Sequence, residues 1–215
     1  MKYTILCYGD SNTYGYIPAG GGKRYDEDTR WTCRLQNQLG KEYHVIEEGC
    51  SGRTTDVDDP DAPWKNGMSG LLISLHSHKP IDMIILMLGT NDLKTVFHRD
   101  AETIAASAAS VAEEAVRYLS TKQDTVPQIL FLCPPPLYEH VQDGIFGKEF
   151  DHRSYLVSLQ LPEHYRKQAE QNGYMYMDTS RFLTSSETDG IHLTPEAHAR
   201  LADALSALIQ SGRIA

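Results

Sequence analysis

The sequence predicts a three-layer αβα fold with a five-stranded parallel sheet, because short apolar runs alternate along the chain with helix-like segments. The five runs are residues 3–8, 44–47, 83–88, 129–133 and 174–177. Apolar residues fill the run 83–88 without alternation, which is typical of a strand covered on both faces. We therefore expect helices to pack on both faces of the sheet.

The helical segments carry apolar residues spaced three or four positions apart, as on one face of an amphipathic helix. The pattern is clearest over residues 101–121, where the stripe consists of Ile104, Ala108, Val111, Ala112, Ala115, Val116 and Leu119. Weaker patterns predict helices over residues 32–39, 70–78 and 162–171. The last helix is expected to begin at Pro195, with Thr194 as its N-cap.

Three segments show neither pattern, and we expect them to be irregular: residues 15–29, 51–68 and 134–160. The third is longer than a usual connection, and its apolar and aromatic residues are expected to form a pocket wall or an oligomer surface. No repeat, low-complexity stretch or change of composition divides the chain. We therefore expect residues 1–215 to form a single domain.

Composition and charge exclude several classes of partner. The net charge of −9 disfavours contact with nucleic acid phosphates and with anionic lipid. No apolar run approaches the ~20 residues that a transmembrane helix needs, and the first apolar stretch is too short for a signal peptide. The four cysteines form no CxxC pair and no zinc spacing. These features predict a cytoplasmic protein with free thiols, and neither a metal nor a cofactor.

Polar residues follow the predicted strands at the points where the strands end. Residues 9–12, 49–54 and 89–92 come after the first three runs, and residues 189–192 follow the fifth. Because ligands bind beyond the carboxyl ends of parallel strands, these four segments are expected to meet at one edge of the sheet.

The residue types in these segments fit nucleophilic catalysis. A serine hydroxyl such as that of Ser11 needs an adjacent base, and His192 is suited to that role. Asp189 precedes His192 by three residues, so its carboxylate can hold the other ring nitrogen. The backbone N–H groups of Ser11 and Gly52 and the amide of Asn91 are candidate oxyanion donors. Each motif alone is also common in turns or helix caps, but their joint occurrence in order predicts a catalytic site.

On these motifs the chain resembles the GDSL-type, or SGNH, hydrolases. The matching blocks are Gly9-Asp10-Ser11, Gly52, Gly89-Thr90-Asn91-Asp92 and Asp189-x-x-His192. The resemblance implies a flavodoxin-like fold, with Ser11 as nucleophile, Asp189 and His192 completing the triad, and Gly52 and Asn91 in the oxyanion hole. It also implies one of the family's activities, which include those of esterases, lipases, acyltransferases and carbohydrate deacetylases.

A second, looser resemblance is to the bacterial arylesterase and acyltransferase branch of that family. It is carried by residues 52–55, Gly-Arg-Thr-Thr, and by Asp58-Asp59-Pro60. This resemblance implies small acyl groups and a homo-oligomer. Asn12 departs from the family pattern, which has leucine after the nucleophile, and it places a polar side chain beside Ser11.

Other residues have two interpretations. His76 and His78 suggest either a metal site or surface histidines, and Asp56, Asp58, Asp59 and Asp61 suggest either calcium or a solvated loop. We favour the second interpretation of each, since neither set completes a known ligand pattern. Trp64 lies in a loop and is expected to line the pocket or an interface. Together with Asn12 and Ile191, it is a candidate substrate-binding residue.

The sequence therefore predicts a short-acyl carboxylic ester hydrolase that acts through an acyl-enzyme on a small-molecule ester. Three alternatives remain: an acyltransferase that uses the same residues, a carbohydrate O-acetyl esterase, and a non-catalytic binding module that kept the scaffold.

Overall fold

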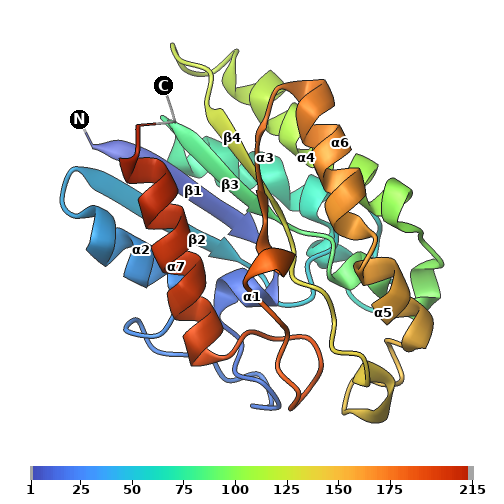
Figure 1. Ribbon diagram of the computed structural model, residues 1–215. Helices are drawn as coiled ribbons and strands as arrows, with labels where there is room; N and C mark the ends of the chain where they lie inside the picture. The colour runs from blue at the N-terminus through green and yellow to red at the C-terminus, as the bar shows by residue number, and fades with distance from the viewer. Residues whose placement is uncertain (1, 213–215) are drawn as a thin grey trace.

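In the computed structural model, which describes residues 2–212, five parallel strands form one sheet in the order β2-β1-β3-β4-β5 (Figure 1). The strands are β1 (Tyr3–Gly9), β2 (Tyr43–Gly49), β3 (Met83–Met87), β4 (Gln128–Cys133) and β5 (Met175–Asp178). The predicted strands are confirmed, with ends that differ by one or two residues. This strand order is that of flavodoxin-like folds, and the connections diverge between β1 and β3, where such sheets bind ligands.

Seven α-helices are described: α1 (Ser11–Tyr14), α2 (Trp31–Leu39), α3 (Gly67–His78), α4 (Ala101–Leu119), α5 (His152–Ser158), α6 (Leu161–Asn172) and α7 (Pro195–Gln210). Helices α2 and α7 pack together on one face of the sheet, and α3, α4 and α6 cover the other (Figure 1). The predicted three-layer arrangement is therefore confirmed.

The continuous apolar runs are explained by burial on both faces. In β1, Ile5 and Cys7 belong to the core under α2 and α7, whereas Leu6 and Tyr8 belong to the core under α3, α4 and α6. Successive side chains of a strand point to opposite faces, so both sets must be apolar. Trp31 is fully buried and anchors α2 on the first of these cores.

Two helices were not predicted. Helix α1 has only four residues, too few for a periodic pattern, and it forms because the Asp10 carboxylate accepts the backbone N–H of Asn12 (2.9 Å). Helix α5 lies inside the segment 134–160, so the prediction that this whole segment is irregular was wrong. A capping box between Asp151 and Ser154 starts α5, and this pair was the available sequence signal. Similarly, Asn66 caps α3 and starts it at Gly67, inside the segment 51–68.

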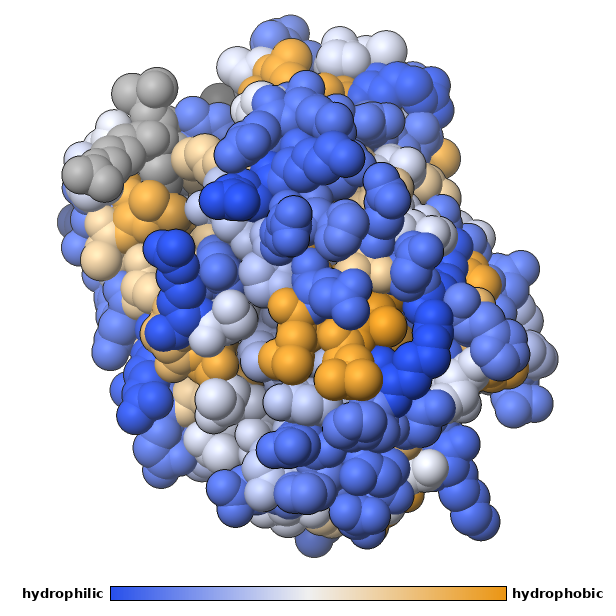
Figure 2. Space-filling view, turned by 45° about the vertical axis from the view of Figure 1, so that its right-hand side comes forward, coloured by the Kyte–Doolittle hydropathy of each residue, from blue (hydrophilic) through white to orange (hydrophobic). Residues whose placement is uncertain are grey.

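The surface is mainly hydrophilic on the face shown in Figure 2, where apolar groups form small patches among charged and polar side chains. Between residues 2 and 212, no helix combines the length and apolarity that crossing a bilayer requires.

A buried histidine in α7 links the fold to pH. The Nδ1 atom of His198 accepts the backbone N–H of Trp31 (3.3 Å), and Nε2 has no partner within the described residues. Burial and then the charge of Arg30 lower the pKa of His198 to about 4. The unfolded chain therefore binds this proton near pH 6.5, and the folded chain binds it only near pH 4. His198 thus removes about 3 kcal/mol of stability as the pH falls through this window.

Asp10 acts in the opposite direction, because burial raises its pKa to about 6. In the folded state it takes up its proton before the unfolded chain does, so it adds stability as the pH falls from about 6 towards 3.8. Asp10 is present in both proteins, so we expect His198→Gln to remove only the first effect, and the free energy of unfolding of the variant to rise relative to that of the parent as the pH falls from 6.5 to 4.5. Urea denaturation at three pH values measures the difference. The exposed His44→Gln is the matched control, and parallel curves for His198→Gln and the parent would contradict the prediction.

Candidate active site

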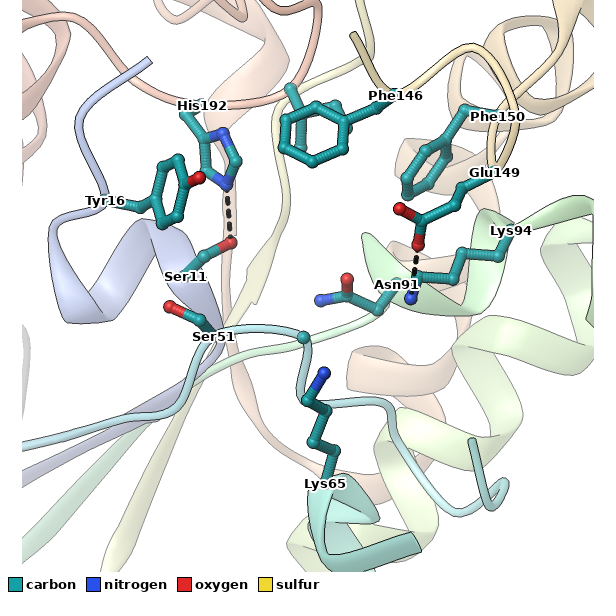
Figure 3. Close-up of a pocket in the computed structure, with 12 residues that line it drawn as sticks. Ser11, Tyr16, Ser51, Lys65, Asn91, Lys94, Phe146, Glu149, Phe150 and His192 are labelled. Carbon is teal, nitrogen blue, oxygen red and sulfur yellow. Dashed lines mark hydrogen bonds and ion pairs between the residues drawn. The ribbon is translucent and has the colours of Figure 1, made fainter. Parts of the chain in front are cut away.

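Three side chains from the two ends of the chain form a hydrogen-bonded series. The Nε2 atom of His192 lies 3.0 Å from Ser11 Oγ, and its Nδ1 lies 2.7 Å from Asp189 Oδ2. All three residues are buried. The nucleophile, base and carboxylate that the sequence suggested are thus brought together in the order that a catalytic triad requires (Figure 3 shows the Ser11–His192 bond).

Ser11 owes its position to a sharp turn at the end of β1. A Cβ atom on Gly9 would lie 2.1 Å from Thr13 Oγ1 and 2.8 Å from the carbonyl oxygen of Met87, so only glycine fits there. The chain then enters α1 directly, and Ser11 is its first residue. This turn places Ser11 at the carboxyl edge of the sheet.

The Asp189 carboxylate is held by four donors. Its Oδ1 accepts the backbone N–H groups of Ile191 (3.1 Å) and His192 (3.0 Å), and its Oδ2 accepts the N–H of Ala19 (3.0 Å) in addition to His192 Nδ1. Desolvation raises the pKa of Asp189, but these bonds and the His192 ring outweigh it and keep the pKa below its ordinary value. The ionised carboxylate therefore holds the proton on Nδ1 and leaves Nε2 free to accept the Ser11 proton.

Asn12 holds the loop that carries His192. Its Oδ1 accepts the backbone N–H of Leu193 (3.0 Å), and its Nδ2 donates to the carbonyl oxygen of Ile191 (3.4 Å). Its side chain is buried and does not line the pocket. The polar side chain at this position thus joins the nucleophile's helix to the residues on either side of His192, and it does not contribute to the lining of the pocket.

Two aromatic rings fix the orientation of the imidazole. Tyr16 stacks on His192 with a centroid separation of 4.2 Å, and Phe146 meets the ring edge-on at 5.7 Å. Phe146 lies in the segment that we expected to form a pocket wall. Tyr16 had no role in the sequence analysis, because no periodicity or motif distinguishes it in the segment 15–29.

The candidate oxyanion donors lie in the same pocket as Ser11 and His192. Gly52 lines this pocket and adopts a left-handed backbone with φ of 84°. Asn91 Nδ2 donates to the carbonyl oxygen of Arg53 (3.0 Å), which fixes the amide and leaves its second N–H for the pocket. The four polar segments therefore converge at one edge of the sheet, as the sequence indicated.

The pocket has a volume of about 160 Å³, close to the roughly 150 Å³ of an apolar cavity that holds benzene. Phe146, Phe150 and Ile191 supply its apolar wall. Ile191 is therefore in the expected place. Trp64 lies outside: it is 72% exposed and lines a neighbouring surface pocket with Asp59 and Lys94.

Three charged side chains also line the catalytic pocket: Lys65, Lys94 and Glu149. The Nζ atom of Lys94 lies 2.7 Å from Glu149 and 3.2 Å from Asp59. Desolvation lowers the pKa of Lys94, but the two carboxylates outweigh it and raise the pKa above its ordinary value. The sequence analysis missed all three residues, since each stands alone in a loop or short turn.

Five of the six side chains considered as metal ligands have other partners. Asp56 pairs with Arg99, Asp59 with Lys94, and Asp58 accepts from Asn66. His78 lies 2.8 Å from Glu48, and His76 contacts Tyr118. Within residues 2–212, no group of three or more His, Cys, Asp or Glu side chains is arranged to hold a metal ion.

The sequence and the fold of this chain are similar to those of known proteins. Residues 7–200 match the model of the GDSL-like lipase/acylhydrolase family. A carbohydrate acetylesterase from Sinorhizobium meliloti is 34% identical with a TM-score of 0.89, and covers 98% of this chain and 99% of its own. The M. smegmatis aryl esterase is 35% identical with a TM-score of 0.89, and covers 97% and 99%. No curated protein matches the sequence.

Proposed function

Because the chain belongs to the GDSL-like lipase/acylhydrolase family and is an esterase, we propose that it hydrolyses short-chain acyl esters through a Ser11–His192–Asp189 triad. One observation carries the proposal: His192 bridges the Ser11 hydroxyl and the Asp189 carboxylate at 3.0 and 2.7 Å.

The reaction follows from this geometry. Ser11 Oγ attacks the ester carbonyl while His192 Nε2 takes the hydroxyl proton, and Asp189 stabilises the resulting imidazolium. His192 then gives the proton to the leaving alcohol, and the acyl group remains on Ser11. Water, activated by the same nitrogen, releases the acid and restores the serine.

The negative charge on the carbonyl oxygen needs donors that are fixed before the reaction. The backbone N–H groups of Ser11 and Gly52 and the free N–H of Asn91 fit this role. The hydrogen bond from Asn91 to the Arg53 carbonyl supports this role. It orients the amide in advance, so that no free energy is spent on reorienting the amide during the reaction.

The size of the pocket supports a small acyl group. With a volume of about 160 Å³ and an apolar wall that includes Phe146 and Phe150, it has room for a short chain or one ring. We expect 4-nitrophenyl acetate to have a kcat/KM at least about tenfold higher than 4-nitrophenyl octanoate, since methylenes that do not fit cost binding energy.

The measurement keeps the leaving group constant and varies only the acyl chain from acetyl through butanoyl to octanoyl, below the solubility limit of each ester. Phe146→Ala enlarges the pocket at its apolar wall. We therefore expect this variant to shift the ratio of kcat/KM values towards the esters with longer acyl chains, whatever its effect on the overall rate. An octanoyl ester turned over as fast as the acetyl ester would contradict the short-acyl assignment.

A second candidate function is the removal of O-acetyl groups from carbohydrates. The exposed Trp64 ring lies in a polar pocket that shares Lys65, Lys94 and Glu149 with the catalytic pocket. An aromatic face beside polar groups suits a sugar ring, and one relative is a carbohydrate acetylesterase. Acyl transfer to alcohols has less support, because the charged lining does not make a dry approach channel.

We also propose a cytoplasmic location and a homo-oligomeric state. The first is supported by the four cysteines, which are all free thiols, as in a reducing compartment. The second is implied by the resemblance to the arylesterase branch.

A further inference from the structure

Lys65 places an ammonium group in the catalytic pocket. It ends the short turn Pro63–Lys65 that precedes α3, and its side chain runs along Gly52. A methyl group on Gly52 would lie 2.9 Å from Lys65 Cδ and 3.0 Å from Nζ. In Figure 3 the side chain rises into the pocket from the side opposite His192.

This ammonium group has no hydrogen bond and no ion pair within the part of the chain that the structure describes. The charge of Lys65 interacts with that of Asp59 without direct contact. The Asp59 carboxylate already accepts hydrogen bonds from Lys94 (3.2 Å) and from the backbone N–H of Asp61 (3.1 Å). Glu149 is held by Lys94 at 2.7 Å. Lys94 therefore contacts both carboxylates, whereas the Lys65 ammonium group contacts neither within residues 2–212.

The lining of the pocket is less acidic than the molecule as a whole. The chain carries a net charge of −9, yet the charged side chains that line the pocket are two lysines and one glutamate. An unpaired cation beside the reacting groups, partly shielded from water, is an attractive partner for an anion.

The geometry also indicates which part of an ester would reach Lys65. The leaving oxygen must lie within hydrogen-bonding distance of His192 Nε2, which protonates it. The acyl chain departs from the same carbon in another direction. Because Lys65 and His192 lie on opposite sides of the pocket, the acyl side of the ester, with its carbonyl oxygen at Gly52 and its acyl chain, faces the ammonium group, and the leaving alcohol does not.

We propose that Lys65 binds a carboxylate at the far end of the acyl group, so that the preferred substrates are monoesters of short dicarboxylic acids. This inference rests on the proposed ester hydrolysis by Ser11. The ester C–O bond breaks, the alcohol leaves with the proton from His192, and water releases the dicarboxylate. The distal carboxylate takes no part in the bond changes and only positions the acyl chain.

Two pairs of esters with the same shape and different charge test the inference. Monoethyl succinate and ethyl 4-methylpentanoate differ by a carboxylate or an isopropyl group on the acyl side, and ethanol release is measured. Acetoxyacetate and isobutyl acetate carry the same difference on the alcohol side, and acetate release is measured. Hydrolysis of ethyl acetate by the wild type tests the proposed function separately.

Lys65→Met removes the charge and keeps most of the length of the unbranched side chain. We expect it to lower kcat/KM for monoethyl succinate at least about tenfold, mainly through KM, and to leave ethyl 4-methylpentanoate within about twofold. Lys65→Arg should recover most of the loss. Lys148→Met is the matched control, since Lys148 is exposed in the neighbouring pocket and does not line the catalytic one.

Three results would overturn the inference while leaving ester hydrolysis by Ser11 intact. An equal loss for both acyl-side esters would mean that Lys65 supports the oxyanion in general. A larger loss for acetoxyacetate than for monoethyl succinate would place the anion on the alcohol side. An unchanged kcat/KM of Lys65→Met for monoethyl succinate would mean that the ammonium group does not bind the carboxylate of the substrate.

Discussion

Ser11→Ala is expected to lower kcat for 4-nitrophenyl acetate by roughly 10⁶-fold, the largest effect of any single change in this chain. Without Oγ, His192 Nε2 has no hydroxyl proton to take, and no acyl-enzyme can form. The fold should tolerate the change, because within residues 2–212 the only side-chain hydrogen bond of Ser11 is the one to His192. The thermal stability of the variant should therefore stay close to that of the parent.

The pocket offers an internal control for this experiment. Ser51 lines the same pocket as Ser11, and none of the described residues offers its hydroxyl a base at hydrogen-bonding distance. A serine-directed fluorophosphonate should therefore label the wild type and Ser51→Ala but not Ser11→Ala, and the labelled peptide should contain Ser11. Turnover retained by Ser11→Ala, or a label on Ser51, would refute the assignment of the nucleophile. If the folded wild type is not labelled at all, the non-catalytic binding module becomes the better account.

The strands and the catalytic residues could be predicted because each leaves a local signal. A strand buried on both faces must be continuously apolar, as residues 83–88 are. Residues at the ends of parallel strands converge whatever lies between them, which connects Ser11 with Gly52, Asn91 and His192 across the chain. The topology alone thus gathers the reacting groups.

The surroundings of the triad left no such signal. Ala19 donates to Asp189 through its backbone N–H, which any residue except proline could do. Tyr16, Lys65 and Lys94 come from irregular segments, where the position of a side chain depends on tertiary contacts and not on spacing. Asn12 shows the reverse case: its identity was noticed, but its two bonds to the His192 loop became evident only in three dimensions.

The second large effect is expected for Asp189→Asn, which should lower kcat by about 10⁴-fold with little change in KM. The asparagine oxygen can still accept the N–H groups of Ile191 and His192, so the loop keeps its shape. Its NH₂ group then replaces Oδ2 and faces His192 Nδ1 at 2.7 Å. A donor at that point favours the tautomer with the proton on Nε2, which cannot accept the proton of Ser11.

The same substitution also places that NH₂ group against the N–H of Ala19, a donor facing a donor. Some loss of stability is therefore expected, and the thermal melting curve separates it from the catalytic effect. Asp143→Asn removes an exposed carboxylate and serves as the control for the change in charge. A folded Asp189→Asn that keeps more than about a tenth of the wild-type kcat would show that Tyr16 and Phe146 alone orient the imidazole. In that case the contribution of Asp189 to catalysis would be small, because the stacked Tyr16 and the edge of Phe146 would suffice to hold Nε2 towards the nucleophile.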